Sequence, residues 1–337
     1  MRDQTICNGV PAQAQRGVRD ALLCTSVRTA LLDVILGYDC NLACDYCTIT
    51  PQMRERSMTT RAVLLALARG RAEGFDAVSF TGGEPTIRRD LVGLVREARS
   101  LGYSDIKVQS NGLLFAQGRN VDALVTAGVT RFHVSVHTHR GAAYDRLVQR
   151  EGSHALMAAA LDELVARDAT LVADLILKED TYRELPEAVA WLHARGVRAA
   201  HLWYVSLTDG NRERIESLPR MTDVMPFVHE ALSFARAHDM ELWSLHIPRC
   251  LLGSDLAHAY DPGADRVRVV TPESTFDLRD SRLAGRVHVP ACEGCEHRSV
   301  CPGVRPDYLE VFGDAEVAMA RGQPARVTRT RRLPVLG

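Results

Sequence analysis

The sequence predicts an α/β fold, a partial (β/α)6 barrel followed by a loop-rich C-terminal module. Three observations predict it: six apolar strand segments alternate with helical segments, the strands carry polar residues at every second position, and proline and glycine become frequent in the last third of the chain. Alternating strands and helices give a parallel sheet with right-handed crossovers. Six units are too few to close an eight-stranded barrel, so we expect an open sheet with its site at the carboxyl ends of the strands.

The predicted elements follow from hydrophobic periodicity and capping residues. Thr59 or Thr60 can cap the first helix, which ends near Gly74. The strands are expected at 31–36, 77–80, 106–109, 132–136, 171–178 and 199–205, and helices at 60–74, 90–101, 153–167 and 183–195. The expected organisation is an N-terminal lead-in (1–27), the barrel (28–217), the C-terminal module (218–320) and a tail (321–337).

Composition and charge narrow the class of protein. The chain has 337 residues, 46% of them hydrophobic, which is enough to bury a barrel-sized core. A formal net charge of -1 gives no basic surplus for nucleic acid. The first residues lack the apolar core of a signal peptide, and no apolar run approaches the roughly 20 residues of a membrane helix. We therefore expect a cytoplasmic protein with no nucleic-acid or membrane partner.

Polar residues occupy a single parity within each predicted strand, and this pattern indicates a polar lumen. Side chains alternate faces along a strand, so these residues can all point inwards while Val, Ile, Leu and Phe face the helices. Buried polar groups need partners, which favours a lumen that holds a polar substrate and a cofactor. The residues of this parity are Asp33, Ser79, Thr81, Lys107, Gln109, His133, Ser135, His137, Asp174, His201 and Trp203.

Within this set, the candidate substrate residues are Lys107, His137, Asp174, His201 and Trp203, together with Lys178. Lys178 shares its face with Asp174, so it could meet an anionic group or pair with that carboxylate.

The segment GYDCNLACDYCTIT carries three cysteines, Cys40, Cys44 and Cys47, within eight residues. Three thiolates at this spacing can converge on one iron-sulfur cube and leave one iron open for a small molecule. A zinc knuckle is the alternative, but it needs a fourth Cys or His nearby, and none follows Cys47 closely. Nine cysteines, six of them in two short triplets, favour metal ligation in a reducing compartment over disulfides. Cys7 and Cys24 are expected to be ordinary thiols.

This segment resembles the cysteine loop of the radical SAM superfamily, C-x3-C-x-aromatic-C, with Tyr46 at the aromatic position. The segment TGGEPT, residues 81–86, resembles the glycine-rich turn of the same family. The resemblance implies a TIM-like partial barrel that binds a 4Fe-4S cluster and S-adenosyl-L-methionine. It also implies that Gly82, Gly83 and Glu84 bind the amino group of that cofactor, and that Ser110, Asn111 and Ser135 contact its ribose or carboxylate.

The C-terminal module carries the second cysteine triplet, Cys292, Cys295 and Cys301. These residues resemble the auxiliary-cluster extensions called SPASM and twitch, although Arg305 stands where SPASM has a further cysteine. The match therefore implies one auxiliary 4Fe-4S cluster, for which Cys250 is our choice of fourth ligand; His288, His297 or a substrate atom are alternatives. A structural zinc site is also compatible with four thiolates.

The resemblance implies a function. Reductive cleavage of S-adenosylmethionine would give a 5'-deoxyadenosyl radical that abstracts hydrogen from a polar substrate. An auxiliary cluster would then accept an electron, completing a two-electron oxidation or oxidative bond formation in which S-adenosylmethionine is consumed. The expected partners are a one-electron donor, such as flavodoxin or ferredoxin, and a small polar metabolite or a peptide.

Alternative functions are a radical SAM epimerase, methyltransferase or peptide maturase, and more remotely a non-enzymatic metal-binding protein. The roughly 28 residues before the first strand are too few for a leader-binding domain, which favours a small molecule as the substrate.

Overall fold

The protein is described by a computed structural model, which covers residues 30–260, 266–281 and 287–322. The expected lead-in (1–27) with Cys7 and Cys24 lies outside the described residues, as does all but the beginning of the expected tail (321–337).

One open sheet organises the chain. Its order is β7-β6-β5-β4-β3-β2-β1-β8-β9, and every neighbouring pair is parallel except β8 and β9. β7 and β9 are the two edges, so the sheet does not close and the predicted partial barrel is confirmed. The strands are β1 (Ala30–Ile35), β2 (Ala77–Thr81), β3 (Asp105–Ser110), β4 (Arg131–Ser135), β5 (Leu171–Leu177), β6 (Ala199–Tyr204), β7 (Glu241–Leu245), β8 (Arg266–Val270) and β9 (Thr275–Asp277).

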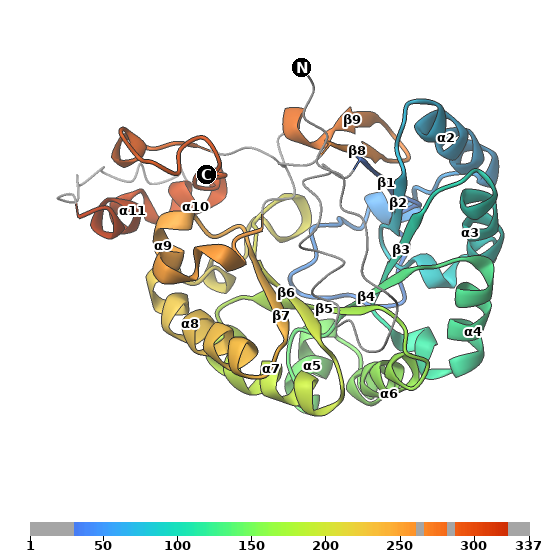
Figure 1. The fold of residues 1–337 in the computed structure, drawn as a ribbon, viewed down its shortest axis with the longest axis horizontal. Helices are drawn as coiled ribbons and strands as arrows, with labels where there is room; N and C mark the ends of the chain where they lie inside the picture. Colours follow the sequence, from blue (N-terminus) through green and yellow to red (C-terminus); the bar gives the residue numbers. More distant parts are fainter. Residues whose placement is uncertain (1–29, 261–265, 282–286, 323–337) are drawn as a thin grey trace, which may run out of the picture.

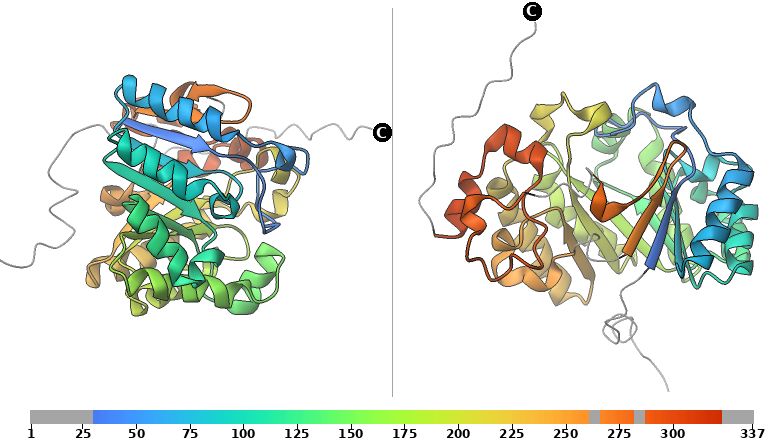
Figure 2. Two further views of the ribbon diagram at one scale, coloured as in Figure 1. Left: turned by 90° about the vertical axis from the view of Figure 1, so that its right-hand side faces the viewer. Right: turned by 90° about the horizontal axis from the view of Figure 1, so that it is seen from above.

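Helices cover the convex outer face of the curved sheet (Figure 1), and the view from above shows the strands inside them (Figure 2). The longer helices are α2 (Thr60–Ala72), α3 (Leu91–Ser100), α4 (Gly118–Ala127), α5 (Gly141–Val148), α6 (Ser153–Val165), α7 (Leu185–Ala194) and α8 (Met221–Ala237). The shorter helices α9 (Arg249–Leu252), α10 (Pro306–Phe312) and α11 (Ala315–Ala320) lie together beside the β7 edge.

The core lies between the strands and these helices. In α3, Leu91, Leu94, Val95 and Ala98 recur at helical spacing and are all buried. They share the core with outward-facing strand residues such as Phe80 and Val108, while the opposite parity faces the hollow of the sheet. This division places the polar parity on one concave surface.

The sheet continues beyond residue 217, where the sequence led us to expect only a loop-rich module. α8 and β7 form a seventh helix-strand unit, and β8 pairs with the free edge of β1. The frequency of proline and glycine misled the prediction, since Pro248 lies only in the short connection between β7 and α9. The six predicted strands were therefore too few.

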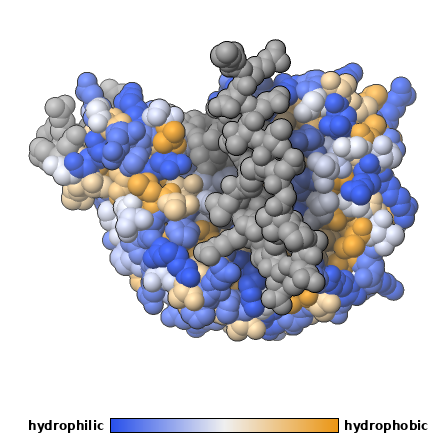
Figure 3. Space-filling view, in the orientation of Figure 1, coloured by the Kyte–Doolittle hydropathy of each residue, from blue (hydrophilic) through white to orange (hydrophobic). Residues whose placement is uncertain are grey.

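The C-terminal helices pack on α8 and on the segment that follows β6. The Tyr308 hydroxyl accepts a hydrogen bond from the Met221 amide at 3.0 Å, and Asp307 accepts one from the Leu207 amide at 2.7 Å. Among the described helices, none combines the length and apolar character needed to cross a bilayer. The face drawn in Figure 3 is mostly hydrophilic where it is coloured, with apolar residues interspersed.

Candidate functional site

A cavity of about 950 Å³ opens at the carboxyl ends of the strands. Its lining combines the cysteine loop, the glycine-rich turn and the polar parity of the central strands. The predicted site residues that line it are Cys40, Cys44, Tyr46, Cys47, Gly82, Gly83, Ser110, Asn111, Ser135, His137, Asp174 and Trp203. The structure thus brings most of the predicted cofactor and substrate residues to one space.

Hydrogen bonds to its backbone fix the cysteine loop beside this cavity. The Arg54 guanidinium donates to the carbonyls of Cys40 and Leu42, at 3.3 and 2.8 Å. The Asp45 amide donates to the Leu147 carbonyl at the end of α5, at 3.0 Å. These contacts fix the loop while Cys40, Cys44 and Cys47 face the cavity as free thiols.

The donor set of this loop fits an iron-sulfur cluster. Soft thiolates select such clusters, and three of them border one cavity. Burial raises the pKa of Cys40, and raises that of Cys44 to about 12. The metal-free thiols of Cys40 and Cys44 are therefore protonated at neutral pH, and loading a metal cluster would release their protons.

The glycine-rich turn packs against the start of the cysteine loop. The Gly83 amide donates to the Gly37 carbonyl at 2.9 Å, and the Glu84 amide to the Asp39 carbonyl at 2.8 Å. A Cβ on Gly82 would lie 2.2 Å from the Gly37 oxygen, and one on Gly83 would lie 2.1 Å from the Asp39 oxygen. Only glycine allows this approach of two backbones.

The Glu84 carboxylate is buried and accepts several hydrogen bonds. One oxygen accepts hydrogen bonds from Thr86 and from the Ser110 hydroxyl (2.8 Å), and the other accepts from the Asn111 amide (2.7 Å). Burial raises the pKa of Glu84, and these donors oppose the rise. Asn111 in turn donates to the Asn41 side chain at 2.8 Å. Glu84, Ser110 and Asn111 therefore join three segments at the cavity wall.

Tyr46 is held from both ends. Its hydroxyl lies 2.5 Å from His137 Nε2, and its carbonyl accepts from the Asn211 side chain at 2.8 Å. Burial lowers the pKa of His137 to about 4, so its ring is neutral at pH 7. Sequence reasoning missed the buried Asn211, because nothing in the local sequence links it to a loop 165 residues away.

The substrate candidates separate into two groups. His137, Asp174 and Trp203 line the cavity, and the Trp203 indole donates to Asp174 at 2.9 Å. Lys107, Lys178 and His201 are not among its described lining residues. Lys107 is level with Ser79 of β2 and with Arg131, the first residue of β4.

Lys178 does not form the predicted pair with Asp174. The buried Nζ pairs with Asp45 of the cysteine loop at 3.1 Å and with Asp180 at 2.7 Å, and not with Asp174. The sequence could not indicate the pair with Asp45, because Asp45 follows β1 and Lys178 follows β5. Lys178 therefore anchors the cysteine loop to the end of β5.

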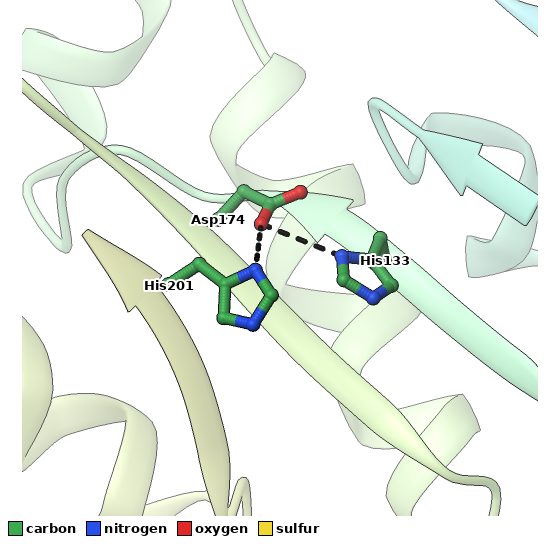
Figure 4. A group of neighbouring side chains, drawn as sticks. All are labelled: His133, Asp174 and His201. Atoms are coloured by element: carbon green, nitrogen blue, oxygen red, sulfur yellow. Dashed lines mark ion pairs between the residues drawn. The ribbon is translucent and has the colours of Figure 1, made fainter. Parts of the chain in front are cut away.

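Asp174 lies beside two histidines of the neighbouring strands (Figure 4). Burial lowers the pKa of His133, and lowers that of His201 to about 4. Burial by itself raises the pKa of Asp174, but His133, His201 and the Trp203 donor outweigh it and bring the pKa to about 2. At neutral pH the cluster therefore holds one carboxylate between two neutral imidazoles.

The β8–β9 hairpin contributes to the cavity, which sequence reasoning did not anticipate. Thr271, Glu273 and Phe276 line it. The Tyr38 hydroxyl donates to Glu273 at 2.9 Å, and Arg56 pairs with the same carboxylate at 3.2 Å. The hairpin is thereby fastened to the cysteine loop.

The second cysteine group surrounds a separate small pocket. Its lining includes Cys250 from α9, together with Cys292, Cys295 and Cys301, and the two alternative ligands His288 and His297. Burial, and to a smaller extent the neighbouring thiols, raises the pKa of Cys250 to about 11. A single pocket thus gathers all the residues considered for an auxiliary cluster.

Comparisons with known proteins agree with this geometry. A probable GTP 3',8-cyclase from Saccharolobus solfataricus is 35% identical over 107 residues, or 32% of this chain and 34% of that protein. The chain thus spans about a third of the length of such curated relatives. A probable GTP 3',8-cyclase from Sulfurisphaera tokodaii is 23% identical over 238 residues, which cover 70% of this chain and 74% of that protein.

Among solved structures, Streptococcus suis SuiB bound to precursor peptide SuiA superposes with a TM-score of 0.64 at 12% identity. The superposition covers 89% of this chain and 75% of SuiB, and it supports the fold alone. The sequence profile of the radical SAM superfamily matches residues 34–207, more than half of the chain, with the cysteine loop and the glycine-rich turn inside the match. On this match, this fold and this cavity, the chain belongs to the radical SAM superfamily.

Proposed function

We propose that the chain is a radical SAM oxidoreductase that acts on a small polar substrate with the help of an auxiliary 4Fe-4S cluster. Cys40, Cys44 and Cys47 would hold the first cluster, and Cys250, Cys292, Cys295 and Cys301 the second. When bound, the first cluster and S-adenosylmethionine supply a 5'-deoxyadenosyl radical, the hydrogen-abstracting agent of this superfamily. The observation that carries the proposal is the convergence of Cys250 with the distant C-terminal triplet on one pocket.

The chain's own residues would position the cofactor and exclude water. The Gly82–Gly83 turn, braced by Glu84, offers backbone close to the cysteine loop, where the amino group of S-adenosylmethionine would bind. Tyr46, fixed by His137 and Asn211, would cover the same end of the cavity. A closed and preorganised site protects reactive intermediates from side reactions.

The charges around the cavity favour a neutral or cationic polar substrate. Asp33, Asp174, Asp209 and Glu273 line it, whereas Arg54 and Arg56 are its described lysine or arginine neighbours. Arg54 is engaged with loop carbonyls, and Arg56 with Glu273. A nucleoside triphosphate, such as the name of the curated relatives suggests, would need several cations here. We therefore favour a substrate with amino or hydroxyl groups.

A peptide substrate is the second candidate, supported by the similarity to SuiB, whose structure contains a precursor peptide. Incubating the reduced protein with S-adenosylmethionine and GTP, a pool of amines, amino acids and sugars, or a pool of peptides separates the three options. Substrate-dependent 5'-deoxyadenosine with GTP alone would contradict our assignment of the substrate class.

Metal analysis tests the cluster assignment. Two four-iron clusters require about eight iron and about eight sulfide per chain. The variant with Cys40, Cys44 and Cys47 all changed to Ala should keep about half of the iron and make no 5'-deoxyadenosine. Cys250→Ala should lose auxiliary iron, whereas Cys250→Ala with full iron and unchanged spectra would contradict the proposal that Cys250 is a ligand.

A further inference from the structure

The strongest unexplained group in the described chain is the cluster of His133, Asp174 and His201, one residue from each of β4, β5 and β6. Figure 4 shows both imidazole rings turned with Nδ1 towards one oxygen of the Asp174 carboxylate. His133 Nδ1 lies 3.5 Å from this oxygen and His201 Nδ1 lies 3.6 Å from it. One ligand atom from each of the three residues lies within 4.8 Å of the others. We propose that these residues bind a borderline divalent transition-metal ion such as Zn²⁺.

The distances favour a metal over direct hydrogen bonds. The separations of 3.5 and 3.6 Å exceed the normal length of an N–H···O bond, up to about 3.2 Å. Two ligands of a tetrahedral zinc ion, each about 2.1 Å from the metal, lie about 3.4 Å apart. The histidine-carboxylate spacings are therefore close to the spacing that a shared ion requires.

Two polar atoms of the cluster lack protein partners. His201 Nδ1 and Asp174 Oδ2 are buried, and neither has a hydrogen-bond partner in the described chain. Asp174 is only 3% exposed and His133 only 4% exposed. Buried polar groups are normally satisfied, so the unpartnered Nδ1 of His201, which faces Asp174 Oδ1, points to a missing ligand between them.

The chemistry of the donor set selects the class of metal. Two imidazoles and one carboxylate suit zinc and similar borderline ions, whereas soft thiolates suit iron-sulfur clusters. The Trp203 indole donates to Asp174 at 2.9 Å and thereby fixes the carboxylate, as groups around metal ligands commonly do. The site is therefore chemically distinct from both cysteine groups.

The position of the metal site beside the large cavity would allow the ion to bind a substrate. Asp174 lines the large cavity, while the two histidines flank it in the sheet. Three protein ligands leave a fourth position open, as in catalytic zinc sites. An ion here would accept an oxygen or nitrogen atom of a substrate bound deep in the cavity.

Zinc binding to the holoenzyme tests this inference. Protein with intact clusters, incubated with Zn²⁺ alone and desalted, should retain about one zinc per chain. Its X-ray absorption spectrum should show nitrogen and oxygen neighbours at about 2.0–2.1 Å and no sulfur at about 2.3 Å. His201→Gln and Asp174→Asn should each weaken zinc binding at least tenfold. His238→Gln, at an exposed position directly after the C-terminal end of α8, is the matched control and should bind as the wild type does.

Zinc retention unchanged in His201→Gln, a sulfur shell, or no retained zinc would each overturn the inference. If Asp174→Asn proves insoluble, His133→Gln serves as the second ligand variant. Iron content measured on the same samples reports on the two cysteine groups, so failure of the zinc site and failure of the proposed clusters are distinguishable.

Discussion

The carboxylate of Glu84 accepts a hydrogen bond from the backbone amide of Asn111 at 2.7 Å, and this bond joins the ends of β2 and β3. The Ser110 hydroxyl donates to the other oxygen of Glu84. The buried Glu84 side chain therefore holds the glycine-rich turn in position. Glu84 acts here by orienting backbone around the cavity.

Glu84→Gln should destabilise the protein and weaken cofactor binding. An amide NH2 would face donors that now meet a carboxylate oxygen, and unsatisfied buried donors cost about 1–3 kcal/mol each. We expect the free energy of unfolding to fall by about 2 kcal/mol and the affinity for S-adenosylmethionine, measured by equilibrium dialysis, to fall at least tenfold. Glu230→Gln, on the exposed face of α8, is the control. Wild-type affinity in Glu84→Gln would show that the turn does not depend on this carboxylate.

Arg88→Lys should loosen the cysteine loop at its base. One guanidinium nitrogen of Arg88 donates to the carbonyls of Leu36 and Met58, at 3.0 and 2.9 Å, which are the two ends of the loop. The same side chain pairs with Asp90 through two further nitrogens. Lysine cannot reproduce this planar fork, so we expect a loss of about 1–3 kcal/mol and lower iron content after reconstitution.

Arg89→Lys is the matched control for this variant, because Arg89 is the exposed neighbour in the same turn. Equal iron content in Arg88→Lys and Arg89→Lys would contradict a role of Arg88 in closing the loop.

Local patterns in the sequence were sufficient for much of this architecture. The period-two alternation located the six central strands, and the spacing of Cys40, Cys44 and Cys47 located the site, because both signals act within a few residues. The place of β8 beside β1 was not predictable, since its partner lies more than two hundred residues earlier. The partners of Lys178 and Tyr46 were missed for the same reason. These contacts join segments that the curvature of the sheet brings together, and a local sequence pattern carries no information about that curvature.

Lys178→Met should be strongly destabilising because it leaves Asp45 without its buried cation. The Lys178 side chain is only 5% exposed and Asp45 is 21% exposed, so solvent screens the pair poorly. Removing one partner of a buried pair costs about 3–5 kcal/mol, whereas surface pairs contribute about 0–1 kcal/mol. Urea denaturation should show that the free energy of unfolding falls by about 3 kcal/mol, the lower end of the range for buried pairs.

The double variant Lys178→Met with Asp45→Asn should recover part of that loss, since the only carboxylate of the group left without its cation is Asp180, whose side chain is 62% exposed to water. Arg183→Met, which breaks an exposed pair with Glu179, is the control and should change stability little. A simple sum of the two single effects in the double variant would mean that Lys178 and Asp45 do not interact energetically.

His137 should make the protein less stable as the pH falls below 6.5. Burial lowers its pKa to about 4 from an ordinary value of 6.5, so the unfolded chain binds more protons than the folded one between these values. Stability from neutral burial is fully present above pH 6.5 and is lost as the pH falls towards 4. The loss at pH 5.5 is about 1.4 kcal/mol, one pH unit below the unfolded pKa.

His137→Asn isolates this contribution, because Asn also tolerates the positive φ of 60° at this position and does not titrate. The difference in unfolding free energy between pH 7 and pH 5.5 should shrink by about 1 kcal/mol in this variant. His238→Asn replaces an exposed ring and should not reproduce the change seen in His137→Asn. The same pH dependence in His137→Asn as in the wild type would mean that His137 keeps an ordinary pKa, and that its contact with Tyr46 is open to water.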